Sequence, residues 1–204
     1  MADEIRIYLE GGGNGKDGKA KMRRGFDAFF SDLKTAARGK RIRWQVIACG
    51  SRNNAFEDFN IALRQHPHAF NILLVDSEGP VQQPSPWAHL HQRDQWPSSA
   101  ADDSHCHLMA QAMEAWIIAD KNTVATYFGQ NFHRGTLPAN PNVEQIHKDD
   151  LEPALVSATK HTQKGRYHKI RHGADLIGRL DPAIVRRKAG YCDRLFLTIA
   201  AEID

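Results

Sequence analysis

Three acidic residues stand where strands of a parallel sheet are expected to end. Glu10 directly follows the alternating run at residues 5–9, and Asp76 directly follows the apolar run at residues 70–75. Glu78 lies two positions after Asp76, so the two carboxylates point the same way in extended backbone. Side chains at the carboxyl ends of parallel strands meet in one crevice, where ligands bind. We therefore expect Glu10, Asp76 and Glu78 to converge on one site.

Such a cluster favours a divalent cation. Neighbouring carboxylates repel one another, and their pKa values rise unless a cation lies among them. Oxygen ligands without histidine or cysteine at ligand spacing indicate Mg²⁺ or Mn²⁺ rather than zinc. Glu114 is the one charged residue in the run 109–118, so it either reaches the metal or pairs with a buried Arg or Lys. In the alternative interpretation, Glu10 and Asp76 cap helices or lie solvated at the sheet edge.

A basic segment follows later in the chain. Residues 160–171 include five Lys or Arg, interleaved with Tyr167 and followed by His172. This composition is typical of a surface that neutralises backbone phosphates and stacks a base, although charge runs also form ordinary solvated helix faces. Lys169 or His172 would also stabilise charge that develops in a reaction. The residues expected to contact nucleic acid are Lys16, Arg52, Lys164, Arg166, Tyr167, Lys169 and His172.

A glycine-rich run follows the first expected strand. Residues 13–18 match the dinucleotide fingerprint, but the second expected strand ends in Ala48-Cys49-Gly50, without the acidic residue that would bind ribose. A phosphate-binding P-loop fails as well, because Asp17 follows Lys16 where Ser or Thr is needed. One interpretation of the glycine run remains: backbone N–H groups at a helix N-terminus, with Lys16 nearby, bind an anion.

Histidine and cysteine residues do not form a metal-ligand pattern. Histidines occur in two i, i+2 pairs, and a cysteine lies inside the second pair: His89, His91, His105, Cys106 and His107. This spacing, without a distant matching pair, is not that of a structural zinc site. The chain has three cysteines, which lie far apart and are expected to be free, buried thiols: Cys49, Cys106 and Cys192.

Hydrophobic periodicity predicts the elements that position these residues. Strands are expected over residues 5–9, 42–48 and 70–75, separated by amphipathic helices over about 18–38 and around 56–63. A βαβαβ pattern with right-handed crossovers predicts an α/β fold, a three-layer, mostly parallel sheet with helices on both faces.

Two later segments are less regular. Residues 108–119 are expected to form a fourth strand that runs into a helix, or one buried helix. Residues 79–104 contain four prolines and are expected to form a long irregular excursion, which in compact domains is often a lid or a partner surface. The domain predictions are an α/β domain over residues 1–136 and a small helical C-terminal region over residues 137–204.

Length and composition define the class of protein. The 204 residues suffice for one core, and 41% apolar and 25% charged residues are typical of a soluble globular chain. No apolar stretch approaches bilayer length, and the acidic N-terminus does not resemble a secretory signal, so we expect a cytoplasmic protein without membrane contact. A formal net charge of +3 does not by itself indicate nucleic acid.

Two stretches of the sequence resemble the Toprim family. Ile-Tyr-Leu-Glu-Gly-Gly-Gly-Asn ends at Asn14, and Leu-Leu-Val-Asp-Ser-Glu ends at Glu78; they match a strand-terminal Glu with glycine and an acidic pair after a later strand. Nearly the whole chain also resembles the domain-of-unknown-function family 4276. The runs that support this likeness are residues 48–53, 86–87, 92–94, 113–116, 140–144 and 164–167.

The Toprim likeness implies roles for the acidic residues. In Toprim enzymes the first Glu is a general acid or base and the later acidic pair binds Mg²⁺, which here implies Glu10, Asp76 and Glu78. Such proteins are typically encoded beside ABC-type ATPases resembling those of overcoming-lysogenization-defect systems, which implies a nuclease in bacterial anti-phage defence. Asn14 stands where many Toprim nucleases have Asp, and Glu78 replaces the second Asp, which bears on whether two metals bind.

The sequence therefore predicts Mg²⁺- or Mn²⁺-dependent cleavage of DNA or RNA by a nuclease subunit that works with an ABC-type ATPase. Asp76 and Glu78 would hold the metal, and Glu114 would complete or support its coordination shell. Glu10 would transfer a proton or bind a second ion, and Lys169 would stabilise developing charge. The alternatives are a non-catalytic subunit that binds nucleic acid or an ATPase, and a nucleotide-binding enzyme that uses the glycine run.

Overall fold

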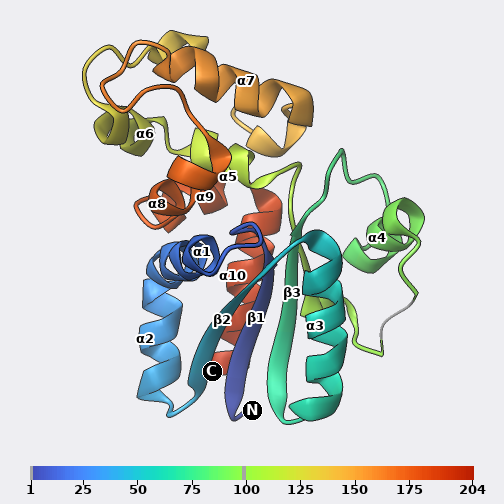
Figure 1. Ribbon diagram of the computed structural model, residues 1–204. Helices are drawn as coiled ribbons and strands as arrows, with labels where there is room; N and C mark the ends of the chain where they lie inside the picture. Colours follow the sequence, from blue (N-terminus) through green and yellow to red (C-terminus); the bar gives the residue numbers. More distant parts are fainter. Residues whose placement is uncertain (1, 98–99) are drawn as a thin grey trace.

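The protein has an α/β fold in the computed structural model, which describes residues 2–97 and 100–204 (Figure 1). Residues 1 and 98–99, which fall within the predicted first domain and the predicted excursion, lie outside this description. A single parallel sheet has the strand order β2-β1-β3-β4. Its strands are β1 (Glu4–Glu10), β2 (Arg43–Gly50), β3 (Ala69–Asp76) and β4 (Cys106–Met109). The predicted parallel α/β sheet is confirmed.

Helices cover both faces of this sheet. One face packs against α1 (Lys16–Phe29), α2 (Ser31–Gly39) and α10 (Gly190–Ile203), and the other packs against α3 (Arg52–Gln65) and α4 (Pro86–Asp94). Side chains of β1 alternate between the two layers, because successive residues of a strand point to opposite faces. Ile7 and Leu9 belong to the first core, and Tyr8 belongs to the second. The three-layer arrangement is therefore confirmed.

The helix expected over residues 18–38 is two helices. Helix α1 ends at Phe29, and Phe30 (φ −94°, ψ 18°) joins it to α2. The break leaves Phe29 and Phe30 in the same apolar layer, where both rings contact the ring of Phe196 at centroid distances of 5.5 Å. Apolar spacing continues across the break, which is why periodicity alone predicted one helix.

The expectation of an irregular excursion over residues 79–104 is partly wrong. Helix α4 begins there, with the Ser85 side chain accepting a hydrogen bond from the Ala88 N–H at 3.3 Å and Pro86 in the first turn. Both are standard N-terminal signals. A short 3₁₀ turn, η1 (Asp103–His105), leads into β4. Later in this segment, the ring of Trp96 stacks on the ring of Phe56 in α3 at a centroid distance of 4.2 Å. This contact holds the segment on the face of the sheet that α3 covers.

The chain after β4 is helical, and it packs on the same core as the strands. Helix α8 approaches α1 so closely that a Cβ on Gly25 would lie 2.3 Å from the Ala174 carbonyl oxygen. None of the described helices is long and apolar enough to cross a bilayer. The elements are α5 (Met113–Ala119), α6 (Lys121–Phe128), η2 (Arg134–Thr136), η3 (Val143–Gln145), α7 (Lys148–Thr159), the π-helical η4 (Lys169–Gly173), α8 (Ala174–Ile177) and α9 (Pro182–Lys188).

Candidate metal centre

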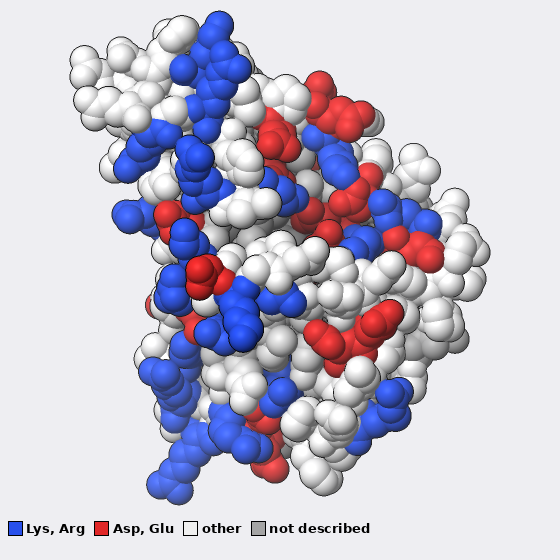
Figure 2. Space-filling model, in the orientation of Figure 1, with Lys and Arg blue, Asp and Glu red and all other residues white. Residues whose placement is uncertain are grey.

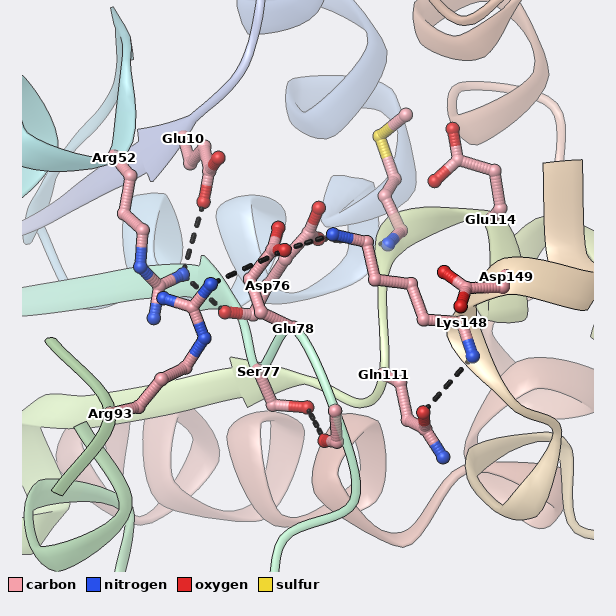
Figure 3. Close-up of polar contacts among 12 residues, drawn as sticks. Glu10, Arg52, Asp76, Ser77, Glu78, Arg93, Gln111, Glu114, Lys148 and Asp149 are labelled. Atoms are coloured by element: carbon pink, nitrogen blue, oxygen red, sulfur yellow. Dashed lines mark hydrogen bonds and ion pairs between the residues drawn. The ribbon is translucent and has the colours of Figure 1, made fainter.

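Three carboxylates meet where the strand order of the sheet reverses. Strands β1 and β3 are neighbours, while β2 lies on the far side of β1, so the carboxyl ends of β1 and β3 border the switch point at which open parallel sheets bind ligands. Glu10 ends β1 and Asp76 ends β3. One carboxylate oxygen from each of Glu10, Asp76 and Glu78 lies within 4.8 Å of the others (Figure 3). The structure thus brings together the three carboxylates that the sequence predicts to converge.

The glycine run holds Glu10 in this position. Gly11 and Gly12 have φ values of 129° and 86°, in the region that favours glycine. A Cβ on Gly18 would lie 2.1 Å from the Gly12 carbonyl oxygen, so the loop packs directly on the first turn of α1. Paired backbone hydrogen bonds between Gly11 and Gly50, at 2.9 and 3.1 Å, fasten the loop to the end of β2. Backbone packing therefore explains these glycines without a bound dinucleotide.

Asp76 is the most enclosed of the three carboxylates. It is 2% exposed, and its Oδ1 accepts a hydrogen bond from the Met113 N–H at 2.8 Å. Its Oδ2 accepts one from Lys169 Nζ at 3.2 Å. Burial raises the pKa of Asp76, and the charge of Glu114 raises it further against the opposing effect of Lys169. A divalent cation at this carboxylate would reverse that shift.

Glu10 shares its oxygens with an arginine network. Burial first, and then the charge of Asp76, raise the pKa of Glu10 to about 7, although Arg52 acts in the opposite direction. Arg52 Nη1 donates to Glu10 Oε2 at 3.3 Å and also to the main-chain oxygen of Asp76. The rest of the guanidinium holds Asp94 through two bonds of 3.0 and 2.7 Å and lies over the Trp96 ring. Arg52 is therefore a positioning residue between the two strand ends.

Glu78 is the member of the group whose pKa is lowered. Its own burial would raise its pKa, but the hydrogen bond and charge of Lys148, followed by the charge of Arg93, lower it. Lys148 Nζ contacts Glu78 Oε2 directly, and Arg93 Nη2 lies 3.4 Å from the same oxygen. Gln111 fixes the geometry, since its carbonyl accepts from the Glu78 N–H at 2.9 Å and its Oε1 accepts from the Lys148 N–H at 3.0 Å.

Glu114 does not join the three converging carboxylates of the described residues. Its Oε1 accepts a hydrogen bond from the Tyr167 hydroxyl at 3.0 Å, and its Oε2 lies 3.3 Å from Lys169 Nζ. Lys169 thus bridges Glu114 and Asp76. Burial lowers the pKa of Lys169, but the two carboxylates outweigh it and the net shift is upward. Of the two roles that the sequence allowed for Glu114, the structure shows the pairing with a basic residue.

The ion pairs of the centre contain one more carboxylate than basic side chains. They involve five carboxylates (Glu10, Asp76, Glu78, Asp94 and Glu114) and four cations (Arg52, Arg93, Lys148 and Lys169). A cavity of about 190 Å³ lies between Glu10, Asp76 and the glycine loop, with Met109, Met113 and Ile170 in its walls. It has room for several waters, since each occupies about 30 Å³ in the liquid.

The donor set fits a hard divalent cation. Mg²⁺ binds oxygen at about 2.1 Å in octahedral geometry, so adjacent ligands lie about 3.0 Å apart and opposite ligands about 4.2 Å apart. The oxygens of Glu10, Asp76 and Glu78 lie within 4.8 Å of one another, so side-chain rotation has to bring them closer for all three to bind one ion. All three donors are carboxylate oxygens, which favour Mg²⁺ or Mn²⁺ over zinc.

Comparison with known families gives a match over most of the chain. The family model described as Domain of unknown function (DUF4276) matches residues 9–200, which include every residue of the centre. The chain belongs to the DUF4276 family. The resemblance to that family noted in the sequence is therefore confirmed. Neither the curated proteins nor the solved structures contain a match to the chain.

The residues that the sequence assigned to nucleic acid occupy different environments in this DUF4276 protein. Lys16, Lys164 and Arg166 are exposed, whereas Arg52 and Lys169 form the ion pairs of the centre. Two assignments are corrected. Tyr167 and His172 are each 3% exposed and pack against one another at 6.2 Å, so neither ring offers a face to a base.

Several members of the centre were missed by sequence reasoning. Arg93 and Asp94 lie in the last turn of α4, and the Ser85-Pro86 pair that starts this helix was the signal for them. Gln111, the uncharged polar residue in an apolar run, was a further signal. Lys148 has no distinguishing feature in its local sequence, and only the docking of α7 brings it to Glu78.

Proposed function

We propose that this chain is a Toprim-like phosphodiesterase that cleaves DNA or RNA with Mg²⁺ or Mn²⁺ bound at the candidate centre. One observation supports this above all: Glu10, Asp76 and Glu78 place carboxylate oxygens within 4.8 Å of one another at the switch point of the sheet. Such a cluster of carboxylates is costly unless a metal ion, protons or basic side chains offset its charge.

The three carboxylates have separable roles in this proposal. Asp76 and Glu78 hold the cation, with Glu10 as a further ligand or as the proton-transfer group. A bound divalent cation stabilises the negative charge that builds up on a phosphate as its ester bond breaks. Glu10 suits proton transfer because burial and the charge of Asp76 raise its pKa to about 7, where a general acid or base is most effective near neutral pH.

The basic side chains of the centre become phosphate ligands when a cation binds. Arg52 stays a positioning residue, and the other three, Arg93, Lys148 and Lys169, come from α4, α7 and η4. Glu10 and Asp76 end strands, so these three basic side chains move without displacing those carboxylates. The side chains of Arg93, Lys148 and Lys169 are 37, 36 and 41% exposed. A divalent ion at Asp76 repels the Lys169 ammonium, which then reaches the phosphate oxygens and stabilises their charge.

The biological setting in this proposal is bacterial anti-phage defence in the cytoplasm, with an ABC-type ATPase as partner subunit. Its support is the resemblance of the glycine run and the acidic pair to the Toprim pattern. Lys16, Lys164 and Arg166 are exposed and available to nucleic-acid phosphates.

A cleavage assay tests the proposal. Purified protein is incubated with supercoiled plasmid or with an RNA pool, in MgCl₂, MnCl₂ or EDTA. Asp76→Asn keeps the side-chain shape and removes the charge, and Asp149→Asn is the matched control, because Asp149 is exposed and lies beside the centre (Figure 3). We expect metal-dependent cutting by the native protein and by the control but not by Asp76→Asn. Cutting by Asp76→Asn equal to that of the native protein would show that the cleavage activity does not come from this centre.

A non-catalytic subunit is the second candidate. Each of Glu10, Asp76 and Glu78 already has a Lys or Arg partner within 4.0 Å, so the chain itself compensates much of their charge. Asn14 and Glu78 also depart from the Toprim pattern. In this case the protein binds nucleic acid or an ATPase. Calorimetric titration with Mn²⁺ separates the candidates, since this one predicts no saturable binding that Asp76→Asn removes.

A further inference from the structure

A groove runs beside the edge of the sheet, and one end of it adjoins the glycine loop of the candidate metal centre, since Lys19 packs against Gly50. Its volume is about 660 Å³. One wall is five consecutive residues of β2, Trp44 to Ala48, and the other is the side of α1 formed by Lys16, Asp17, Lys19, Ala20, Arg23 and Asp27. Successive residues of a strand point to opposite faces, so a groove that touches five in a row follows the edge of the strand.

The helical wall is one continuous stripe. Residues 16, 19, 20, 23 and 27 recur at three- and four-residue spacing, which places them on one side of a helix. The apolar residues of α1, Met22, Phe26 and Phe29, are buried on a different side. The stripe is about 16 Å long at 1.5 Å per residue. Five strand residues span about 13 Å at 3.3 Å per residue, so the two walls match in length.

Strand β2 is an edge strand. The order β2-β1-β3-β4 gives it one strand neighbour, β1, in the sheet of the described residues. Roughly half of its backbone N–H and C=O groups therefore point away from the sheet, toward the groove. An edge of this kind pairs readily with another extended segment unless charge or bulk prevents it.

The charge of the groove selects the partner. Its basic residues lie along α1: Lys16, Lys19 and Arg23. Asp27, at one end, is already paired, because its Oδ1 lies 3.1 Å from both Lys34 Nζ and Trp44 Nε1. Figure 2 shows Lys and Arg side chains gathered on the side of the molecule where α1 and α2 lie. Asp17 is the other acidic residue of the walls, so three basic side chains outnumber two acidic ones, of which Asp27 is paired with Lys34, and a segment that enters the groove meets net positive charge.

We propose that the groove binds an extended, acidic peptide segment of a partner protein, which adds to the sheet as a fifth strand beside β2. Main-chain hydrogen bonds to β2 supply affinity, and acidic side chains of the segment pair with Lys16, Lys19 and Arg23. This interaction surface uses none of the carboxylates of the metal centre, and it shares only Lys16 with the residues assigned to nucleic-acid phosphates.

Two other occupants fit less well. Single-stranded nucleic acid would bring phosphates against the outward carbonyl oxygens of β2, which repel them. A second copy of this chain, paired edge to edge through a two-fold axis, would bring two α1 stripes of the same charge together, along with both copies of the exposed Arg43. An acidic peptide pairs with the outward backbone groups of β2 and also with the basic side chains of α1.

The test uses a fluorescein-labelled heptapeptide that alternates glutamate with valine, and a second that alternates lysine with valine. Anisotropy titration is performed on the full chain and on two double variants of equal charge change. Lys19→Glu/Arg23→Glu alters the groove, and Lys21→Glu/Arg24→Glu alters exposed residues of α1 outside it. Thermal unfolding checks both variants. If the first double variant is unfolded, Arg23→Glu is compared with Arg24→Glu.

We expect the glutamate peptide to bind the native chain and the control variant alike, and the groove variant about tenfold or more weakly. Hydrogen exchange should show new protection of outward amides within residues 44–48 and no change in β3. Equal binding by the two variants, or preference for the lysine peptide, would overturn the proposal. The proposal would also be overturned if the β2 amides became protected only when oligothymidylate was added. It would likewise be overturned if they were protected without peptide in a dimer detected by gel filtration.

Discussion

Lys169 is the side chain whose removal best separates a metal site from a permanent ion-pair network. Its Nζ lies 3.2 Å from Asp76 Oδ2 and 3.3 Å from Glu114 Oε2, so it occupies the place beside Asp76 that a cation would take. Lys169→Met keeps the apolar stem and removes the charge. Without metal, the two buried carboxylates then lose their cationic partner.

The size of the effect follows from burial. Breaking a fully buried ion pair costs about 3–5 kcal/mol, and exposed pairs contribute about 0–1 kcal/mol. Both carboxylates are almost fully buried, but the Lys169 side chain is 41% exposed and therefore screened. We expect Lys169→Met to lower the free energy of unfolding in EDTA by about 1–2 kcal/mol. When Mn²⁺ binds Asp76 in the native protein, the interaction between Asp76 and Lys169 is lost, whereas the variant has no such interaction to lose. Mn²⁺ should therefore bind the variant about 5–30 times more tightly than it binds the native protein.

Urea denaturation in EDTA and calorimetric titration with MnCl₂ measure the two quantities. The exposed Lys160, replaced by methionine, is the control for the loss of one lysine charge in the same region. Unchanged or weaker Mn²⁺ binding by Lys169→Met, relative to Lys160→Met, would refute the reasoning. Lys169 would then be part of the binding site or irrelevant to it, and not a substitute for the metal.

Two further predictions concern stability. Burial, and then the charge of Arg194, lower the pKa of His107 to about 3, so between pH 6.5 and 3 the unfolded chain binds a proton that the folded chain does not. Relative to His107→Gln, the native protein should therefore lose about 2–3 kcal/mol as pH falls from 6.5 to 4.5; a constant difference would contradict this. His107→Gln is the reference because the raised pKa of Glu10 changes stability in the opposite direction over this pH range, and it does so in both proteins. Gly18→Ala should lower the denaturation midpoint strongly, since its Cβ would lie 2.1 Å from the Gly12 carbonyl oxygen. An unchanged midpoint would show that the loop moves freely.

The acidic centre could be predicted because it depends on strand ends. Glu10 and Asp76 each follow a run whose apolar pattern identifies a strand, and parallel strands bring their carboxyl ends to one edge. Right-handed crossovers then place both residues at that edge without knowledge of side-chain packing. Glu78 follows from its spacing to Asp76, although its φ of 64° shows that the backbone turns there instead of continuing extended.

The basic residues of the centre could not be placed in this way. Lys148 and Lys169 reach the carboxylates because α7 packs on α5 and η4 packs on α8, and such docking depends on the three-dimensional packing of distant segments. Composition also did not show which side of a basic segment is buried. Tyr167 was therefore predicted to stack on a base, whereas its hydroxyl donates a hydrogen bond to Glu114 in the interior. The prolines of residues 79–104 obscured the N-terminal signal of α4 at Ser85.

Diffraction from a crystal soaked in MnCl₂ tests the central claim most directly. We predict an anomalous difference peak among the carboxylate oxygens of Glu10, Asp76 and Glu78, accompanied by movement of Lys169 Nζ away from Asp76. A crystal of Asp76→Asn soaked in the same way should show no peak there. If the native crystal shows no peak and Lys169 remains between Asp76 and Glu114, these carboxylates form a structural ion-pair network and the proposed metal site is wrong.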